Sequence, residues 1–140
     1  MKPSIFLAML LSFVIQAICA SEAAAFSEKG RLILENYLKN GEIVFRDGDP
    51  RHLNDPVFQA NAECQAYFMM KMMEDGGRPN DTSVNARSGK HYFLENMKIA
   101  DSKNYNGWET WSYALWEIQL KGRDALAGKL DRPEKCLPSR

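Results

Sequence analysis

The chain has 140 residues, 18 basic and 18 acidic side chains, and an apolar fraction of 45%. This length is enough for one domain with one core. The net charge is zero and the Lys and Arg residues are scattered, so neither a nucleic acid nor an anionic membrane surface is expected as a partner.

Residues 1–20 have the pattern of a secretory signal peptide. A lysine near the start supplies the positive charge, residues 5–18 form an apolar run, and small side chains follow. Cleavage is expected after Ala20, or as late as Ala25. We therefore expect residues 26–140 to form a single exported domain, periplasmic or secreted, with no membrane contact after cleavage.

Two alternatives to a cleaved signal peptide stay open: an uncleaved membrane anchor and a lipoprotein attached through Cys19. Ile18 argues against the lipid, because a lipid-attachment box has a small residue before its cysteine. Ordinary cleavage removes Cys19 and leaves two cysteines in the mature protein.

The two remaining cysteines, Cys64 and Cys136, would then lie in an oxidising compartment. A bridge between them would tie the C-terminal tail to the rest of the domain. It would close a loop of roughly 70 residues, which the chain-entropy treatment values at about 4 kcal/mol. A buried Cys64 with a free Cys136 is the alternative, and the bridge is the preferred prediction.

The mature sequence begins with an amphipathic helix predicted over residues 27–40. Ser27 can cap it, apolar side chains follow at helical spacing, and Gly41 is expected to end it. Residues 43–45 could form a short extended segment, but without a partner strand they do not predict a sheet.

Residues 56–75 are expected to form the central helix. Asp55 can cap it, Pro56 suits its first position, and Gly76 can end it. Apolar side chains cover two faces, as is typical of a helix packed between neighbours. The first face comprises Phe58, Ala62, Ala66, Met69 and Met73, and the second comprises Val57, Ala60, Cys64, Tyr67 and Phe68. A narrow stripe is left for solvent: Gln59, Glu63, Met70 and Glu74.

Two more helices are expected, over residues 90–101 and 108–121. The inward side chains predicted for the first are Phe93, Leu94, Met97 and Ala100. The aromatic side chains of the second predict that it supplies much of the core, through Trp108, Trp111, Leu115 and Ile118 on one face and Tyr113, Trp116 and Leu120 on another. The sequence therefore predicts an all-α fold, a small bundle of about four main helices with a C-terminal tail tethered by a disulfide.

Catalytic patterns are not evident. The two histidines, His52 and His91, stand in a charged segment and on a predicted helix, and no hydrolase, zinc-protease or haem-attachment motif is present. Glutamates on the predicted helices could form an acid–base pair, but any solvated helix carries such residues. We predict no enzyme, no cofactor and no metal site.

Two polar segments are long enough to project from the bundle, residues 45–55 and residues 76–90. The first concentrates both signs of charge, and such a segment can complement a charged cleft in a partner protein. Solvated connections without a partner are the alternative. The predicted partner-binding residues are Arg46, Asp47, Asp49, Arg51, His52, Arg78 and Arg87.

Four features occur together in this chain. They are the signal peptide, the sequence AECQAY at residues 62–67 in the central helix, the tryptophan-rich helix over residues 108–116, and Cys136 near the C-terminus. With these features the chain resembles the small helical periplasmic immunity proteins that protect bacteria from type VI secretion effectors, in particular the amidase-immunity group. The resemblance implies inhibition by occlusion, in which a loop enters the cleft of a cell-wall amidase or similar toxin.

Two other classes of function stay open: a periplasmic carrier or chaperone for an apolar ligand or partner, and a small wall-active enzyme. A carrier should have an internal apolar cavity, and an enzyme should have carboxylates or histidines that converge in a cleft. An inhibitor should have a protruding polar loop. The sequence leaves open whether the protein is a monomer or a homodimer.

Overall fold

The computed structural model describes residues 26–77 and 82–140. The predicted signal peptide and Arg78 lie outside this part. Within it the chain forms four helices: α2 (Glu28–Val44), α3 (Pro56–Glu74), α4 (Val84–Lys103) and α5 (Gly107–Leu126). No strand occurs among the described residues, and the predicted all-α bundle with a disulfide-tethered tail is confirmed. None of these four helices has the length and apolarity needed to cross a lipid bilayer.

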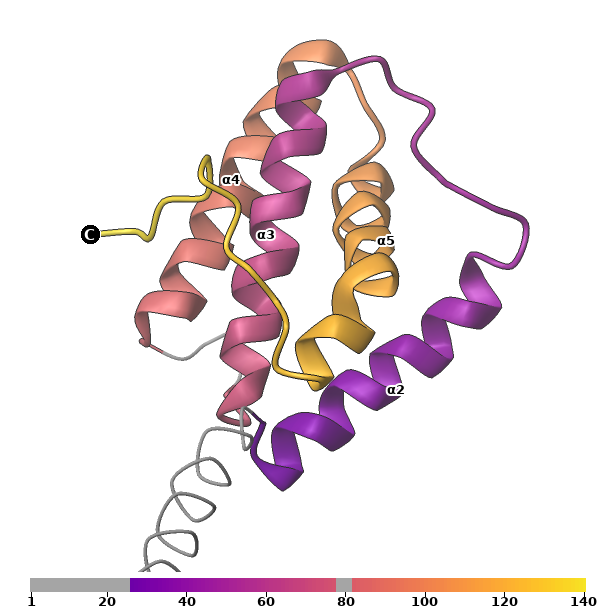
Figure 1. Cartoon of the computed structure of the whole chain (residues 1–140). Helices are drawn as coiled ribbons and strands as arrows, with labels where there is room; N and C mark the ends of the chain where they lie inside the picture. Colours follow the sequence, from indigo (N-terminus) through magenta and orange to yellow (C-terminus); the bar gives the residue numbers. More distant parts are fainter. Residues whose placement is uncertain (1–25, 78–81) are drawn as a thin grey trace, which may run out of the picture.

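α3 lies at the centre of the bundle, as predicted (Figure 1). The other three helices all pack against it, α4 most extensively. α2 begins at the C-terminal end of α3 and crosses α5. Among the helix pairs in contact, α4 and α5 contact each other least, although both pack along α3.

Side-chain caps set where the helices begin. Ser27, Asp55 and Ser83 each accept a hydrogen bond from the backbone N–H three residues further on, at 3.0, 3.0 and 3.2 Å. Asn106 starts α5 in a capping box with Glu109. The first two caps confirm the predicted starts of the first two helices.

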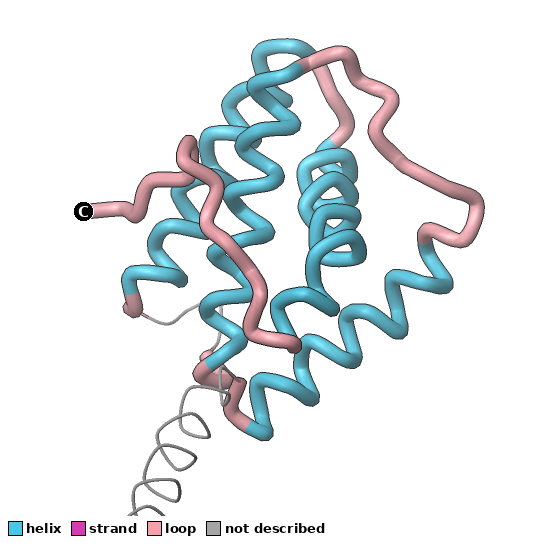
Figure 2. The backbone as a smooth tube through the Cα atoms, viewed as in Figure 1, coloured by secondary structure: helices cyan, strands magenta, loops and turns pink. Residues whose placement is uncertain are grey.

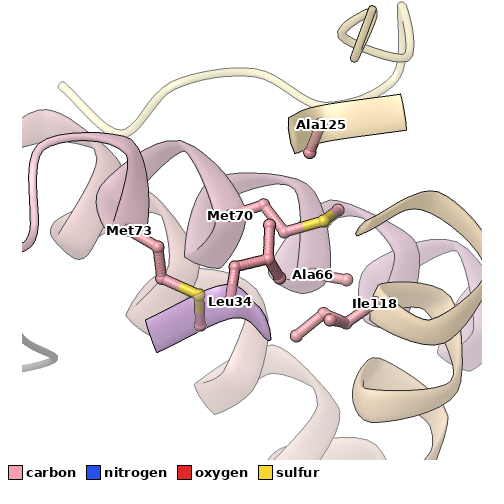
Figure 3. Packing of buried hydrophobic residues seen from close by; sticks show 6 residues of the cluster. All are labelled: Leu34, Ala66, Met70, Met73, Ile118 and Ala125. Atoms are coloured by element: carbon pink, nitrogen blue, oxygen red, sulfur yellow. The ribbon is translucent and has the colours of Figure 1, made fainter. Parts of the chain in front are cut away.

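Three clusters of buried side chains form the core, and α3 contributes to each. The first joins α2, α3 and α5 (Figure 3), and its members are Leu34, Ala66, Met70, Met73, Ile118 and Ala125. The second joins α3, α4 and α5, and its members are Phe58, Ala62, Ala100 and Tyr113. The third joins α3 to the tail, and its members are Cys64, Tyr67, Phe68 and Cys136. The predicted burial of the central helix on more than one face is therefore confirmed.

Some details of the predicted faces of α3 are wrong. Met70, predicted for the solvent stripe, is fully buried, and Val57, predicted for an apolar face, is 62% exposed. Glu63 is only partly exposed, because the ammonium groups of Lys121 and Lys135 pair with its carboxylate. Burial raises the pKa of Glu63, but hydrogen bonds from the two lysines outweigh burial and hold this pKa below its usual value.

α2 extends further than predicted, because Gly41 does not end it. The helix continues to Val44, and the short extended segment suggested for residues 43–45 is therefore wrong. Gly41 is buried where α2 crosses α5, and a Cβ atom there would lie 1.8 Å from the side chain of Gln119. This glycine permits close helix packing, which the sequence alone does not distinguish from a helix stop.

α4 also begins earlier than predicted. The cap at Ser83 starts it at Val84. The predicted polar segment covered residues 76–90, and its second half, from Val84 onward, is therefore helical. Arg87 therefore lies on α4 and not in a loop. Its guanidinium donates a hydrogen bond to the carbonyl oxygen of Thr82 at 2.5 Å. The predicted projecting loop at this place is correspondingly shorter.

The core face of α5 differs from the prediction. Trp108 and Trp111 are 57% and 44% exposed, although both were expected inside. Tyr113 and Ile118 are buried as predicted. Three short side chains of α5 are buried as well: Thr110, Ser112 and Ala114. Short side chains and Tyr113 therefore occupy the buried face of α5, and the indoles of Trp108 and Trp111 lie outside it.

The tail, residues 127–140, crosses α3 and reaches α4 (Figures 1 and 2). The disulfide between Cys64 and Cys136 fastens it to α3, with the two Cα atoms 5.1 Å apart, so the predicted pairing is confirmed. Beyond the bridge, backbone N–H groups of the tail donate to the hydroxyls of Tyr92 and Ser88 on α4 at 2.8 and 2.7 Å. The tail therefore closes over the crossing of α3 and α4.

Replacement of both Cys64 and Cys136 by alanine is expected to lower the free energy of unfolding by about 4 kcal/mol. The reason is that the bridge joins residues 72 positions apart and restricts the unfolded chain accordingly. Urea denaturation of the double variant beside the wild type measures the difference. A loss below about 1 kcal/mol would show that the bridge is not the main constraint on the tail.

Gly30→Ala is expected to destabilise the protein by about 1–3 kcal/mol or more, although alanine favours helix over glycine. Gly30 lies where α2 meets the end of α3, and a Cβ atom there would be 1.9 Å from the carbonyl oxygen of Met73. Gly107→Ala at the start of α5 is the matched control, since a Cβ atom there meets nothing within 4 Å. Similar urea midpoints for the two variants would contradict the close approach.

Candidate functional site

The loop of residues 45–55, here called the anchored loop, joins α2 to α3 along the side of α5 (Figure 2). Figure 1 shows it as a long segment at the edge of the bundle. It begins with a turn at residues 45–47 and contains no helix, yet it bonds to α5 at several points. These bonds give the loop a defined position on the bundle.

Asp49 and Arg51 form the first of these fixed points. The Asp49 carboxylate accepts hydrogen bonds from the backbone N–H of Arg51 at 2.8 Å and from its Nη2 at 2.7 Å. The side-chain hydrogen bond from Arg51 holds the pKa of Asp49 below its usual value. The pair therefore forms a tight charged turn within the loop.

Arg51 also joins the loop to α5. Its Nη1 donates to Oε1 of Glu117 at 3.1 Å, and the Glu117 side chain is only 8% exposed. Lys121 lies 3.4 Å from the other oxygen of the same carboxylate. A buried carboxylate requires such partners, so Glu117 favours the position in which Arg51 reaches it.

His52 makes the second connection to α5. Its Nε2 lies 2.8 Å from Oε1 of Glu109, and its Nδ1 lies 2.9 Å from the carbonyl oxygen of Pro50. Both oxygens are acceptors, so the protonated imidazole, which donates from both nitrogens, fits the site best. Both contacts raise the pKa of His52, and the hydrogen bond with the Pro50 carbonyl contributes more than that with Glu109.

The end of the anchored loop is held by neutral and charged groups together. The backbone N–H of Leu53 donates to the Tyr113 hydroxyl at 2.8 Å. Asp55 caps α3 and also accepts from Lys103 at 2.5 Å and from the Tyr105 hydroxyl at 3.0 Å. The Lys103 hydrogen bond is the main cause that lowers the pKa of Asp55. The loop thus ends where α3, α4 and the start of α5 come together.

The loop tip, comprising Arg46, Asp47 and Gly48, is left exposed by these bonds. The Arg46 and Asp47 side chains are 76% and 93% exposed and lie 3.8 Å apart at their closest polar atoms. Gly48 has a φ of 120°, a conformation that favours glycine, and a Cβ atom there would meet nothing within 4 Å. The tip is therefore free to contact another molecule.

Most of the predicted partner-binding residues lie together in this loop, in two roles. Arg46 and Asp47 are exposed at the tip, whereas the other three hold the loop in place: Asp49, Arg51 and His52. Arg87 lies apart on α4, so its predicted place in a second binding loop is wrong. Arg78 lies outside the described residues.

Glu109 and Glu117 are the site residues that sequence analysis missed. Both were expected to be ordinary solvated helix residues, but the Glu109 side chain is 14% exposed and that of Glu117 8%. The available signal was the position of Glu117 between Trp116 and Ile118 in an apolar stretch of α5. A carboxylate in such a place needs a cationic partner.

A second feature is a groove between α4 and α5 with α3 beneath it, here called the α4–α5 groove. Its volume is about 220 Å³, and its lining includes Gln65, Met69, Gly89, Lys90, Phe93 and Trp111. The Phe93 and Trp111 rings are in contact, with centroids 4.8 Å apart. Gln65 is 2% exposed, and its Oε1 has no hydrogen-bond partner.

No three His, Cys, Asp or Glu side chains within residues 26–77 and 82–140 converge so as to hold a metal ion. Comparison with models of known protein families, with characterised proteins and with solved structures found no significant match. The anchored loop and the α4–α5 groove are therefore the features of this chain from which a function can be inferred.

The contribution of His52 to stability is expected to fall as the pH rises. Because its pKa is raised in the folded protein, its stabilising effect is fully present below its unfolded pKa of about 6.5 and is lost as the pH passes through the higher folded value. Urea midpoints of the wild type and His52→Ala, measured from pH 5 to 9, should therefore converge toward the alkaline end. His91→Ala controls for the loss of an imidazole elsewhere. A constant gap between wild type and His52→Ala would contradict the ionic anchor.

Proposed function

We propose that this protein is an exported, non-enzymatic inhibitor that binds a cell-wall-degrading toxin and occludes its active site. This is the function implied by its resemblance to periplasmic immunity proteins. The observation that carries the proposal is the anchored loop, whose base is bonded to α5 while its charged tip is exposed.

The anchoring matters because binding orders the groups at an interface and loses their conformational entropy. A loop that is already held in one conformation loses less when it enters a cleft. Bonds through Arg51, His52 and Leu53 to α5 hold this loop before any partner arrives. The loop therefore has the pre-organisation that favours an inhibitory segment.

The exposed tip offers a basic and an acidic side chain side by side, Arg46 and Asp47. Arginine is enriched among residues that dominate binding energy, and paired charges of both signs favour orientation and specificity. The weak, exposed contact between the two side chains leaves both free to form new pairs with a partner. These properties favour a polar, charged cleft as the docking site.

Export is supported by the disulfide between Cys64 and Cys136, because such bonds persist in oxidising compartments. A periplasmic location would place the protein where a cell-wall amidase acts. The two cysteines thus support the same compartment as the predicted signal peptide, from an independent part of the chain.

The carrier and enzyme alternatives have less support from the geometry. The α4–α5 groove is open to solvent, and its volume of about 220 Å³ lies below the roughly 300–1,000 Å³ typical of ligand pockets. Glu109 and Glu117 point to the same loop, but each pairs with a basic side chain that holds the loop in place. The loop is therefore the stronger basis for a function.

Arg46→Ala together with Asp47→Ala is expected to weaken binding to the toxin at least tenfold and to leave the thermal melt unchanged, since neither side chain is buried. Co-purification of the tagged, exported protein with cell-wall-degrading toxins identifies the partner. Calorimetry and a peptidoglycan-hydrolysis assay then measure binding and inhibition.

The matched control is Arg31→Ala together with Glu35→Ala, an exposed arginine–carboxylate pair on α2 that is remote in sequence from the loop. This control should retain full binding and inhibition. If the tip variant inhibits the toxin as well as the control does, the loop is not the inhibitory segment.

A further inference from the structure

The outer face of α4 carries charged and apolar side chains in a regular order. Arg87, Leu94 and Asp101 follow one another at intervals of about two helical turns, so they lie on one line along the helix, here called the α4 stripe. All three side chains are exposed, that of Leu94 at 45%. The stripe therefore has a basic group at one end, an acidic group at the other and a leucine at its midpoint.

The fold leaves the two charges at the ends of the stripe without an opposite charge. The guanidinium of Arg87 donates to the carbonyl oxygen of Thr82 but forms no ion pair with a described residue. The Asp101 carboxylate has neither an ion pair nor a hydrogen bond within the described part of the chain. Both charges can therefore pair with groups of another molecule.

Exposed aromatic surface of α5 adjoins the midpoint of the stripe. Trp111 lines the α4–α5 groove together with Leu94, and its ring contacts that of Phe93. Trp108 lies about one turn before Trp111 on the same side of α5, and the two indoles are 57% and 44% exposed. Indoles and aliphatic side chains that are exposed together mark surfaces that bind proteins.

A second copy of the same chain complements the stripe. When two α4 helices pair antiparallel with Leu94 against Leu94, the equal spacing sets Arg87 of each copy opposite Asp101 of the other. A two-fold axis produces this pairing, and two-fold dimers are the commonest soluble oligomers. The arrangement forms two ion pairs between the copies and covers the central leucine of both.

The other charges of the chain permit this arrangement. In the same register Lys90 of one copy faces Lys98 of the other, but Lys98 is already paired with Glu95 at 2.6 Å, so its charge is balanced. The chain has 18 basic and 18 acidic side chains, so two copies do not repel each other through a net charge.

From the self-complementary stripe and the adjoining indoles we infer that this protein forms a two-fold dimer through α4. Leu94 lies at the centre of the interface, and Trp108 and Trp111 of α5 face the second copy. No hydrogen bond, ion pair or ring contact joins these side chains to residues 45–55 in the described structure. The dimer is therefore independent of the anchored loop and of the inhibitory function proposed above.

Analytical ultracentrifugation of the mature protein measures the association. One helix face and two indoles make a small interface, so a Kd of about 10–100 µM is expected. Leu94→Asp should raise this Kd about tenfold or more, because it opposes two carboxylates at the centre of the interface. Leu32→Asp is the matched control: Leu32 lies on α2 and is 55% exposed, and this variant should keep the wild-type Kd.

An exchange of charges tests the antiparallel register. Asp101→Arg alone should raise the Kd about fivefold or more, because Arg87 then meets a like charge at both ends of the interface. Arg87→Glu together with Asp101→Arg should return the Kd toward the wild-type value, since the attraction is restored with its signs reversed. Both effects should diminish at high salt.

Three results would overturn the inference. The first is a purely monomeric wild type at about 1 mM protein, well above the expected Kd. The second is a dimer that tolerates Leu94→Asp as well as Leu32→Asp, which would place the contact on another face. The third is failure of the double charge exchange to recover what Asp101→Arg loses. The wild-type measurement and the charge exchange decide the question even where Leu94→Asp fails to fold.

Discussion

The burial of α3 among three other helices is the constraint on which the rest of the structure depends. A helix covered on most sides needs neighbours that approach closely from several directions, and small residues permit such crossings. Gly30 allows α2 to meet the end of α3, and Gly122 lies where a Cβ atom would be 2.7 Å from Leu38 of α2. At both crossings, a side chain in place of the glycine would overlap the neighbouring helix.

The same helix, α5, connects the fold to the candidate site. Glu117 is buried and needs a cation, and Arg51 supplies it from the anchored loop. Compensation of a buried charge and positioning of the loop are thus a single interaction. His52 adds a second contact, with Glu109, one that depends on protonation. The loop has a defined position because its base bonds to α5. The exposed tip is the part of the loop that makes no bond to α5 in the described structure.

Local patterns in the sequence predict most of this architecture. Caps at Ser27 and Asp55 and the pairing of two cysteines follow from local chemistry and from a simple count, and all are confirmed. The errors arise where a residue has two physical uses. Gly41 resembles a helix stop but serves a helix crossing, and a large apolar residue such as Trp108 resembles core but lies outside it. Lys121 of the same helix lies near Glu117, but the closer partner, Arg51, comes from a distant segment, so the burial of Glu117 was not predictable from α5 alone.

Two polar residues on α3 differ in how far the fold compensates their polar atoms. Glu63 is paired with Lys121 and with Lys135 of the tail, so its charge is compensated and helps to hold the tail in place. Gln65, two positions further on, is more deeply buried, yet its Oε1 is unpartnered. If packing were its only role, an apolar residue of similar volume would fill the same space without an unsatisfied acceptor. The fold therefore compensates the carboxylate of the glutamate with two lysines, whereas no described contact compensates the acceptor of the glutamine.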